Sequence, residues 1–321
     1  MSKKSSFPLK IKRASFFLFG FVFFLLPGQN YYLAAQTSWQ QPVIHQLETD
    51  LLPAAYPVNT TGVEAPSLTT SSIAVLDKNS AVLMYSKQEK TRFLPASTVK
   101  IMTALVVLDY FQLDDILTVR QVSNFGQDME LLENERISVK NLLSGLLINS
   151  ANDAALVLAQ NYSGGRQAFI KAMNQKAQTI HLGDTYFANP TGLDTDEEGN
   201  ILADYSYTTA LDLARLASWA LKNSVFAEII TTRQTVVSDV GGRIKHQLFN
   251  INQLLGKVTG LKGVKTGWTE DAGECLVSYT ERDGHEVIIV VLGSQDRFGE
   301  SLKLIEWAFA NHQWQDLTPS I

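Results

Sequence analysis

The chain has 321 residues, of which 45% are hydrophobic and 18% charged, so it can build a packed core and is not globally disordered. Its formal net charge of −5 argues against a protein that mainly binds nucleic acid, which would need a basic face. The single cysteine, Cys275, excludes an internal disulfide and a multi-cysteine metal site. The five histidines form no His-x-x-x-His pair, so we expect no metal and no cofactor.

Residues 1–35 have the pattern of a secretory signal peptide. Five basic residues and no acidic one precede an apolar run from Ala14 to Leu26, and small residues follow up to Ala35. The apolar run is short for a membrane span, which needs about 20 residues. Counting on to Ala35 leaves an uncleaved anchor in the cytoplasmic membrane as the alternative. In both cases we expect the rest of the chain to be extracytoplasmic: secreted, periplasmic or on the cell-wall side.

The remaining chain divides into three parts. Residues 36–67 contain four prolines and no sustained period, which predicts a linker. Residues 68–314 carry regular patterns that predict one folded domain. Residues 315–321 are a short tail.

Within residues 68–314, strands are predicted at both ends and helices in between. Apolar runs at 73–76 and 81–85 predict one hairpin, and runs at 276–280 and 286–292 predict another. Helices are predicted over residues 97–110, 138–160, 165–180, 208–223 and 300–311, with a long loop over 184–207. We therefore expect an α/β fold: an antiparallel sheet built from both ends of the domain, flanking helices and an inserted helical lobe.

The segment Ser97-Thr98-Val99-Lys100 places a serine and a lysine on one face of the first predicted helix. Serine needs a base beside it, and lysine acts as a base only when it is neutral. The lysine pKa of about 10.4 must therefore fall by roughly 3 units. Burial in this helix, which is apolar on nearly every side, and a second cation nearby would both lower it. Taken alone, the motif also fits a surface serine and a solvated lysine.

A second motif, Ser150-Ala151-Asn152, interrupts the apolar helix predicted over 138–160. Buried hydroxyl and amide groups are costly unless they are paired. The motif is therefore either a polar cap that bends the helix, or a functional triplet. In the functional case Ser150 relays a proton and Asn152 orients Lys100 and a substrate amide.

A third motif, Lys265-Thr266-Gly267, precedes Trp268. The glycine lets a ligand backbone lie close against an edge strand. The lysine and threonine suit a carboxylate on that ligand, and Lys265 is the second cation expected to lower the pKa of Lys100. An ordinary turn is the alternative.

The three motifs together, in this order, are close to the set found in class A β-lactamases and penicillin-binding proteins, with Ser-Ala-Asn in place of Ser-Asp-Asn. The chain resembles the serine D-Ala-D-Ala carboxypeptidases, the low-molecular-mass penicillin-binding proteins, over about residues 68–314. The resemblance extends to the segments 94–104, 148–155, 187–194, 207–210 and 263–273.

The resemblance implies that residues 68–314 form a D,D-carboxypeptidase catalytic domain active in peptidoglycan biosynthesis. Ser97 would attack the carbonyl between two D-alanines of a stem peptide. Lys100 would accept the serine proton, and Ser150 would pass a proton to the departing D-alanine, with Asn152 beside them. β-Lactams would acylate Ser97 as covalent inhibitors.

The resemblance also implies the binding groups. Lys265 and Thr266 would hold the terminal carboxylate, next to Gly267. The oxyanion would lie between the backbone N–H groups of Ser97 and Trp268. Arg297 is a further candidate for a carboxylate contact.

Two other functions stay open from the sequence. A β-lactamase would need a deacylating glutamate in a Glu-x-x-Asn pattern, but Tyr186 stands where that glutamate would be, three residues before Asn189. A non-catalytic relic that binds peptidoglycan is opposed by the intact motif residues. Many relatives continue into a C-terminal β-rich domain with a membrane-binding helix, so we expect any membrane association here through residues 14–35.

Overall fold

The computed structural model describes residues 55–121, 126–194 and 204–316. The predicted signal peptide or anchor, residues 1–35, lies outside the described residues. Within the part that is described, no helix is both long and apolar enough to cross a membrane.

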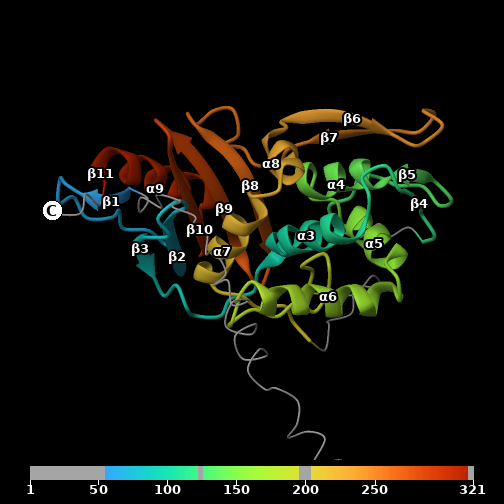
Figure 1. Ribbon diagram of the computed structural model, residues 1–321, viewed down its shortest axis with the longest axis horizontal. Coiled ribbons are helices and arrows are strands. Elements are labelled where there is room, and N and C mark those ends of the chain that lie inside the picture. The colour runs from blue at the N-terminus through green and yellow to red at the C-terminus, as the bar shows by residue number, and fades with distance from the viewer. Residues whose placement is uncertain (1–54, 122–125, 195–203, 317–321) are drawn as a thin grey trace, which may run out of the picture. The chain divides into compact units, whose positions relative to one another are not determined.

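A five-stranded antiparallel sheet in the order β3-β2-β10-β9-β8 forms one side of the domain (Figure 1). The first two strands come from the start of the domain and the other three from its end. Their bounds are β2 Ser72–Asp77, β3 Leu83–Lys87, β8 Leu261–Thr269, β9 Gly273–Arg282 and β10 His285–Ser294. The predicted sheet built from both ends of the domain is confirmed.

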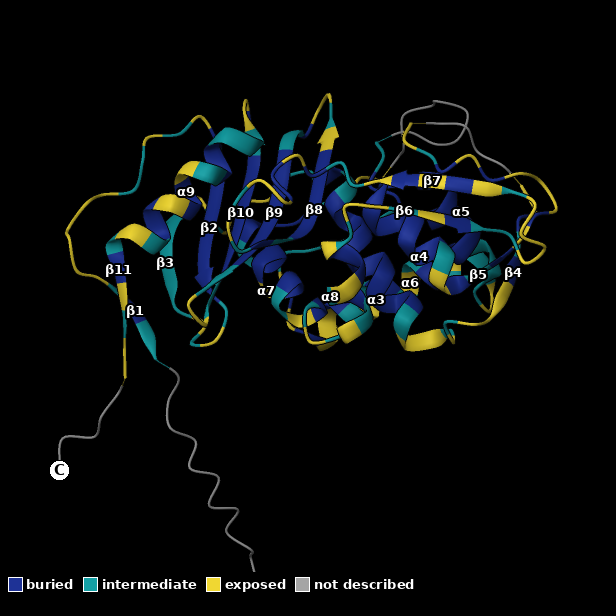
Figure 2. Cartoon of the chain, turned by 90° about the horizontal axis from the view of Figure 1, so that it is seen from above, coloured by how far each residue is buried: buried dark blue, intermediate teal, exposed yellow. Residues whose placement is uncertain are grey.

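Helices cover both faces of this sheet. Helix α9 (Arg297–Asn311) packs on one face, and α7 (Ala210–Ala220) packs on the other. Alternate residues of β2 accordingly join different clusters, with Ile73 facing the α9 side and Ala74 facing the α7 side. Because both faces are covered, β2 and β10 appear in the sequence as nearly continuous apolar runs, and Figure 2 shows both strands buried.

The helical lobe is built around α3, which extends from the short 3-10 helix η1 and contacts α4, α5, α6 and α7. The predicted helix over 97–110 is therefore confirmed as a buried central helix. The bounds in the lobe are η1 Ala96–Val99, α3 Lys100–Tyr110, α4 Val139–Ile148, α5 Asn152–Asn161, α6 Gly165–Thr179 and α8 Ser224–Thr231. The helix predicted over 138–160 is two helices, because the chain turns at Ser150, where φ is +59°.

The short elements were not predicted. They are α8 and three two-stranded ribbons: β4 (Ile116–Thr118) with β5 (Arg136–Ser138), β6 (Gln234–Ser238) with β7 (Lys245–Phe249), and β1 (Tyr56–Asn59) with β11 (His312–Gln315). Strand β1 falls within the stretch predicted as a linker. It is ordered by pairing with a strand more than 250 residues later, which local composition does not reveal.

Candidate active site

Ser97 and Lys100 meet at the junction of η1 and α3. Ala96 precedes them with φ of +47°, and the side chain of Thr98 donates to the carbonyl of Pro95, which closes the turn. Lys100 Nζ then lies 2.9 Å from Ser97 Oγ. The serine therefore sits one helical turn from an amine, as the three-residue spacing predicts.

Lys100 is completely buried, and its amine has two further polar contacts. Nζ lies 2.6 Å from Oδ1 of Asn152 and 2.8 Å from the carbonyl oxygen of Thr191. Burial lowers the pKa of Lys100 to about 7, against the opposing effect of the Asp128 and Asp153 carboxylates. A substantial fraction of Lys100 is therefore neutral at pH 7 and able to accept a proton from Ser97.

The turn between α4 and α5 brings the second motif to the same place. Ser150 Oγ accepts a 2.8 Å hydrogen bond from Lys265 Nζ, while Asn152 contacts Lys100. Ser150 and Asn152 thus link the two lysines, although these lie on η1–α3 and on β8.

Strand β8 brings the third motif against the nucleophile turn. A Cβ on Gly267 would lie 3.0 Å from the Ala96 Cβ and 3.1 Å from the Ser97 nitrogen, so only glycine lets the strand come this close without displacement. The pKa of Lys265 is lowered well below its usual range, first by burial and then by the positive charges of Lys100 and Arg297. Lys100 and Lys265 therefore repel each other, as expected, and burial is the largest cause of the lowered pKa at both lysines.

The remaining predicted residues lie along the same strand edge. Thr266 Oγ1 is buried and has no hydrogen-bond partner among the described residues. Trp268, which follows Gly267 on β8, is 61% exposed. Arg297, at the start of α9, donates a 2.8 Å hydrogen bond to the carbonyl oxygen of Gly267. The arginine thus contacts the third motif through the strand's backbone.

Residues 59–296 match the family described as D-alanyl-D-alanine carboxypeptidase, Peptidase_S11. The chain belongs to this family. It is 31% identical over 256 residues to the carboxypeptidase DacF of Bacillus subtilis, covering 77% of this chain and 64% of that protein's length. It is 33% identical over 248 residues to a D-alanyl-D-alanine endopeptidase of Pseudomonas aeruginosa, covering 75% of this chain and 77% of that one.

The fold agrees with a solved structure of the same kind. The Streptomyces K15 DD-transpeptidase superposes with a TM-score of 0.70 at 31% identity, covering 77% of this chain and all of that one. Both the predicted resemblance to D-Ala-D-Ala carboxypeptidases and the predicted α/β fold are confirmed, and with the family comes hydrolase chemistry.

Sequence reasoning missed how the nucleophile turn of this carboxypeptidase family member is supported. The loop after α6 places Gly192, with φ of +82°, so close that an added Cβ would lie 2.0 Å from the Ala96 carbonyl oxygen. The side chain of Asn189 closes the loop by accepting from the backbone N–H groups of Thr191 and Gly192. The Asn-Pro-Thr-Gly sequence was the available signal, because Asn, Pro and Gly mark tight turns.

A second support was missed entirely. Residues 126–135, which we call the strap, cross the turn between α4 and α5. A Cβ on Gly126 would lie 2.8 Å from Nδ2 of Asn152, so the strap runs directly against the second motif. Residues 126–135 show no periodicity or motif that would have marked them.

Proposed function

We propose that this protein is a serine D-Ala-D-Ala carboxypeptidase that removes the terminal D-alanine from peptidoglycan stem peptides through an acyl-enzyme on Ser97. The observation that carries the proposal is the buried chain of contacts from Ser97 to Lys100 to Asn152, and from Ser150 to Lys265. It gives the serine a base whose pKa of about 7 suits proton transfer near neutral pH.

In the proposed first step Ser97 Oγ attacks the carbonyl carbon between the two D-alanines while its proton moves to Lys100 Nζ. The developing oxyanion is stabilised by the backbone N–H groups of Ser97 and Trp268. The C–N bond then breaks, and the leaving amine takes a proton through Ser150. Water hydrolyses the acyl-enzyme in the second step and regenerates the Ser97 hydroxyl.

The specificity for a free C-terminus follows from the charges at β8. Lys265 is buried and repelled by two other cations, so its ammonium form is unfavourable until an anion arrives. A substrate carboxylate supplies that anion, and the unpartnered hydroxyl of Thr266 can donate a hydrogen bond to it. Arg297, which donates to the Gly267 carbonyl, adds positive charge near Lys265.

The test is mass spectrometry of the protein incubated with diacetyl-Lys-D-Ala-D-Ala, with the wild type beside Ser97→Ala. We expect free D-alanine from the wild type and none from the variant. Equal release from both would remove Ser97 from the mechanism. This chain is similar to one carboxypeptidase and to one endopeptidase. A parallel reaction with a cross-linked peptide therefore tests whether the protein also cleaves within a peptide.

Labelled penicillin tests the two alternatives. We expect a long-lived adduct at Ser97, because Tyr186 stands where a deacylating glutamate would be. Rapid turnover of penicillin would favour a β-lactamase, and failure to attach would favour a non-catalytic binding protein.

We further propose that the enzyme acts outside the cytoplasm, where its peptidoglycan substrate lies. Removal of residues 1–35 or their retention as a membrane anchor stays a prediction. N-terminal sequencing of the mature protein distinguishes the two.

A further inference from the structure

The strap is hydrogen-bonded to the turn that carries Ser150 and Asn152. The backbone N–H of Asn152 donates to the carbonyl of Gln127 at 2.7 Å. The side chain of Asn149 donates to the carbonyl of Asp128, also at 2.7 Å. The carboxylate of Asp128 accepts the backbone N–H of Asp153 at 3.0 Å, in the first turn of α5. The strap therefore fixes residues on both sides of Ser150.

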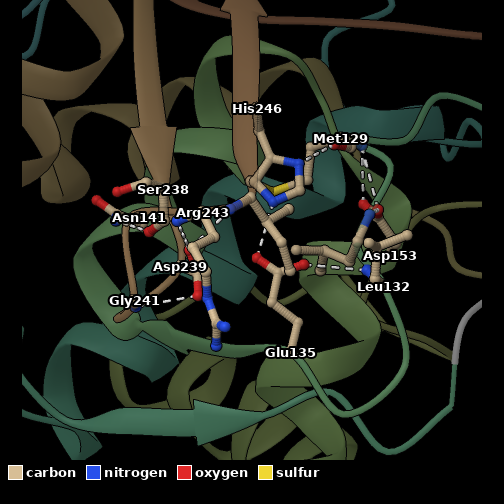
Figure 3. A network of polar contacts seen from close by, with 12 residues as sticks. Met129, Leu132, Glu135, Asn141, Asp153, Ser238, Asp239, Gly241, Arg243 and His246 are labelled. Carbon is tan, nitrogen blue, oxygen red and sulfur yellow. Dashed lines mark hydrogen bonds and ion pairs between the residues drawn. The ribbon is translucent and has the colours of Figure 1, made fainter.

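Side chains of α5 and β7 in turn hold the strap. The carboxylate of Asp153 accepts the backbone N–H groups of Met129 and Leu131 at 3.0 to 3.2 Å. From β7, His246 reaches the carbonyl of Met129 and the buried carboxylate of Glu135, both at 2.8 Å (Figure 3). Because it is held on both sides of residue 128, the strap gives Asp128 a defined position.

Asp128 is a partly buried carboxylate of the strap. It interacts electrostatically with Lys100 on α3 and with Asp153 on α5. Lys265 on β8 also interacts electrostatically with Lys100, and Glu130 and Glu133 line the same open cavity as Asp128. Burial and Asp153 raise the pKa of Asp128 to about 6, so it carries a negative charge in the pH range where Lys100 loses its proton.

From this geometry we infer that Asp128 is a positioning residue for the proposed acylation: it holds the Ser150–Asn152 turn, and its negative charge favours the protonated form of Lys100. The inference rests on the proposed function. A carboxylate near Lys100 favours the ammonium form and so keeps the base inactive at low pH. Asp128 thereby raises the pH above which acylation begins.

The test is the rate constant of acylation by a fluorescent penicillin, measured between pH 5.5 and 9. The wild type is expected to lose activity below a midpoint near 7, the pKa of Lys100. Asp128→Asn keeps a hydrogen-bond acceptor but removes the charge, so its acid limb should move down by about one pH unit. Asp128→Glu should restore the wild-type limb. Glu133→Gln, which removes an exposed carboxylate from the same strap, should leave the limb in place.

Each outcome discriminates. An Asp128→Asn enzyme with a lower plateau but an unmoved acid limb would overturn the inference, since a purely structural role predicts that result. If Asp128→Asn does not give a cooperative thermal transition, Asp128→Ser provides the same charge removal with a smaller acceptor, and its limb must move in the same direction. A wild type that penicillin does not acylate would instead refute the proposed function.

Discussion

The two turns that carry the serines of the site are held in different ways. The turn before Ser97, with φ of +47° at Ala96, is fixed by close backbone approach from Gly192 and Gly267. The turn at Ser150, with φ of +59°, is fixed by the hydrogen bonds and charges of the strap. The first support has no room for an additional atom on Gly192, whereas the second is made mainly of hydrogen bonds, some of them to carboxylates. Position is therefore secured by sterics at the nucleophile and by polar contacts at the relay serine.

The largest effect should come from removing the residue that joins the two turns. Lys100→Met keeps the length of the side chain but cannot accept a proton, so acylation by penicillin should fall by about 10³-fold or more. The transition temperature should not fall in proportion, because the variant no longer buries an amine. Stopped-flow acylation and thermal melting check both parts. Lys140→Met, at an exposed lysine of α4, is the matched control.

If Lys100→Met retained a tenth of the wild-type acylation rate, Lys100 would not be the base that accepts the Ser97 proton. That result would also mean that the contact between Lys100 and Ser97 is structural.

The next effect tests the steric support of the nucleophile turn. Gly192→Ala places a Cβ 2.0 Å from the Ala96 carbonyl oxygen, so the backbone before Ser97 must shift. We expect acylation to fall by about 100-fold, because small displacements of catalytic groups have effects of this size. Gly284→Ala is the matched control, since Gly284 has φ of +80° but no atom within 4 Å of the added Cβ.

The control isolates the cost of the backbone conformation, which is about 1 kcal/mol and should leave the acylation rate unchanged. Equal loss of activity in both variants would show that the close approach of Gly192 is unimportant.

The contrast between the two supports also explains what the sequence could predict. The three motifs and the apolar strands follow local spacing, so the sheet and the residues that converge at Ser97 could be named from the sequence. The support at Gly192 left a partial signal in its turn residues. The strap left none, because its contacts join residues such as Glu135 and His246 that are 111 positions apart. In the sequence, His246 is an isolated histidine with no partner in view.

The electrostatics were predictable in direction only. Burial and a second cation are both expected to lower the pKa of Lys100, and burial is its largest cause, but the opposing effect of Asp128 and Asp153 is not predicted. Neither carboxylate belongs to the three motifs: Asp153 follows the second motif in the first turn of α5, and Asp128 lies on the strap, which the sequence does not reveal.

The smallest effect on catalysis is expected at the far end of the strap, although the effect on stability there is large. Both ring nitrogens of His246 face oxygen atoms, and the side chain of Glu135 is completely buried. His246→Phe leaves that carboxylate without its ring partner, so the free energy of unfolding should fall by about 3 kcal/mol in urea titration. Acylation should fall only a few-fold, because Asp153 still holds Met129 and Leu131.

Two further variants serve as controls for His246→Phe. Asp184→Asn breaks the ion pair between Asp184 and Arg92, whose side chains are 51% and 54% exposed, respectively. The free energy of unfolding should therefore fall by at most about 1 kcal/mol. The double variant His246→Phe, Glu135→Leu removes both buried polar groups and should recover most of the lost stability. Recovery of stability without recovery of the few-fold loss in acylation would mean that the polar contacts position the Ser150 turn beyond their contribution to folding. If His246→Phe lowered the free energy of unfolding no more than Asp184→Asn does, the strap would not depend on the His246–Glu135 pair. The polar support of the Ser150 turn would then come from Asp153 and Asp128 alone.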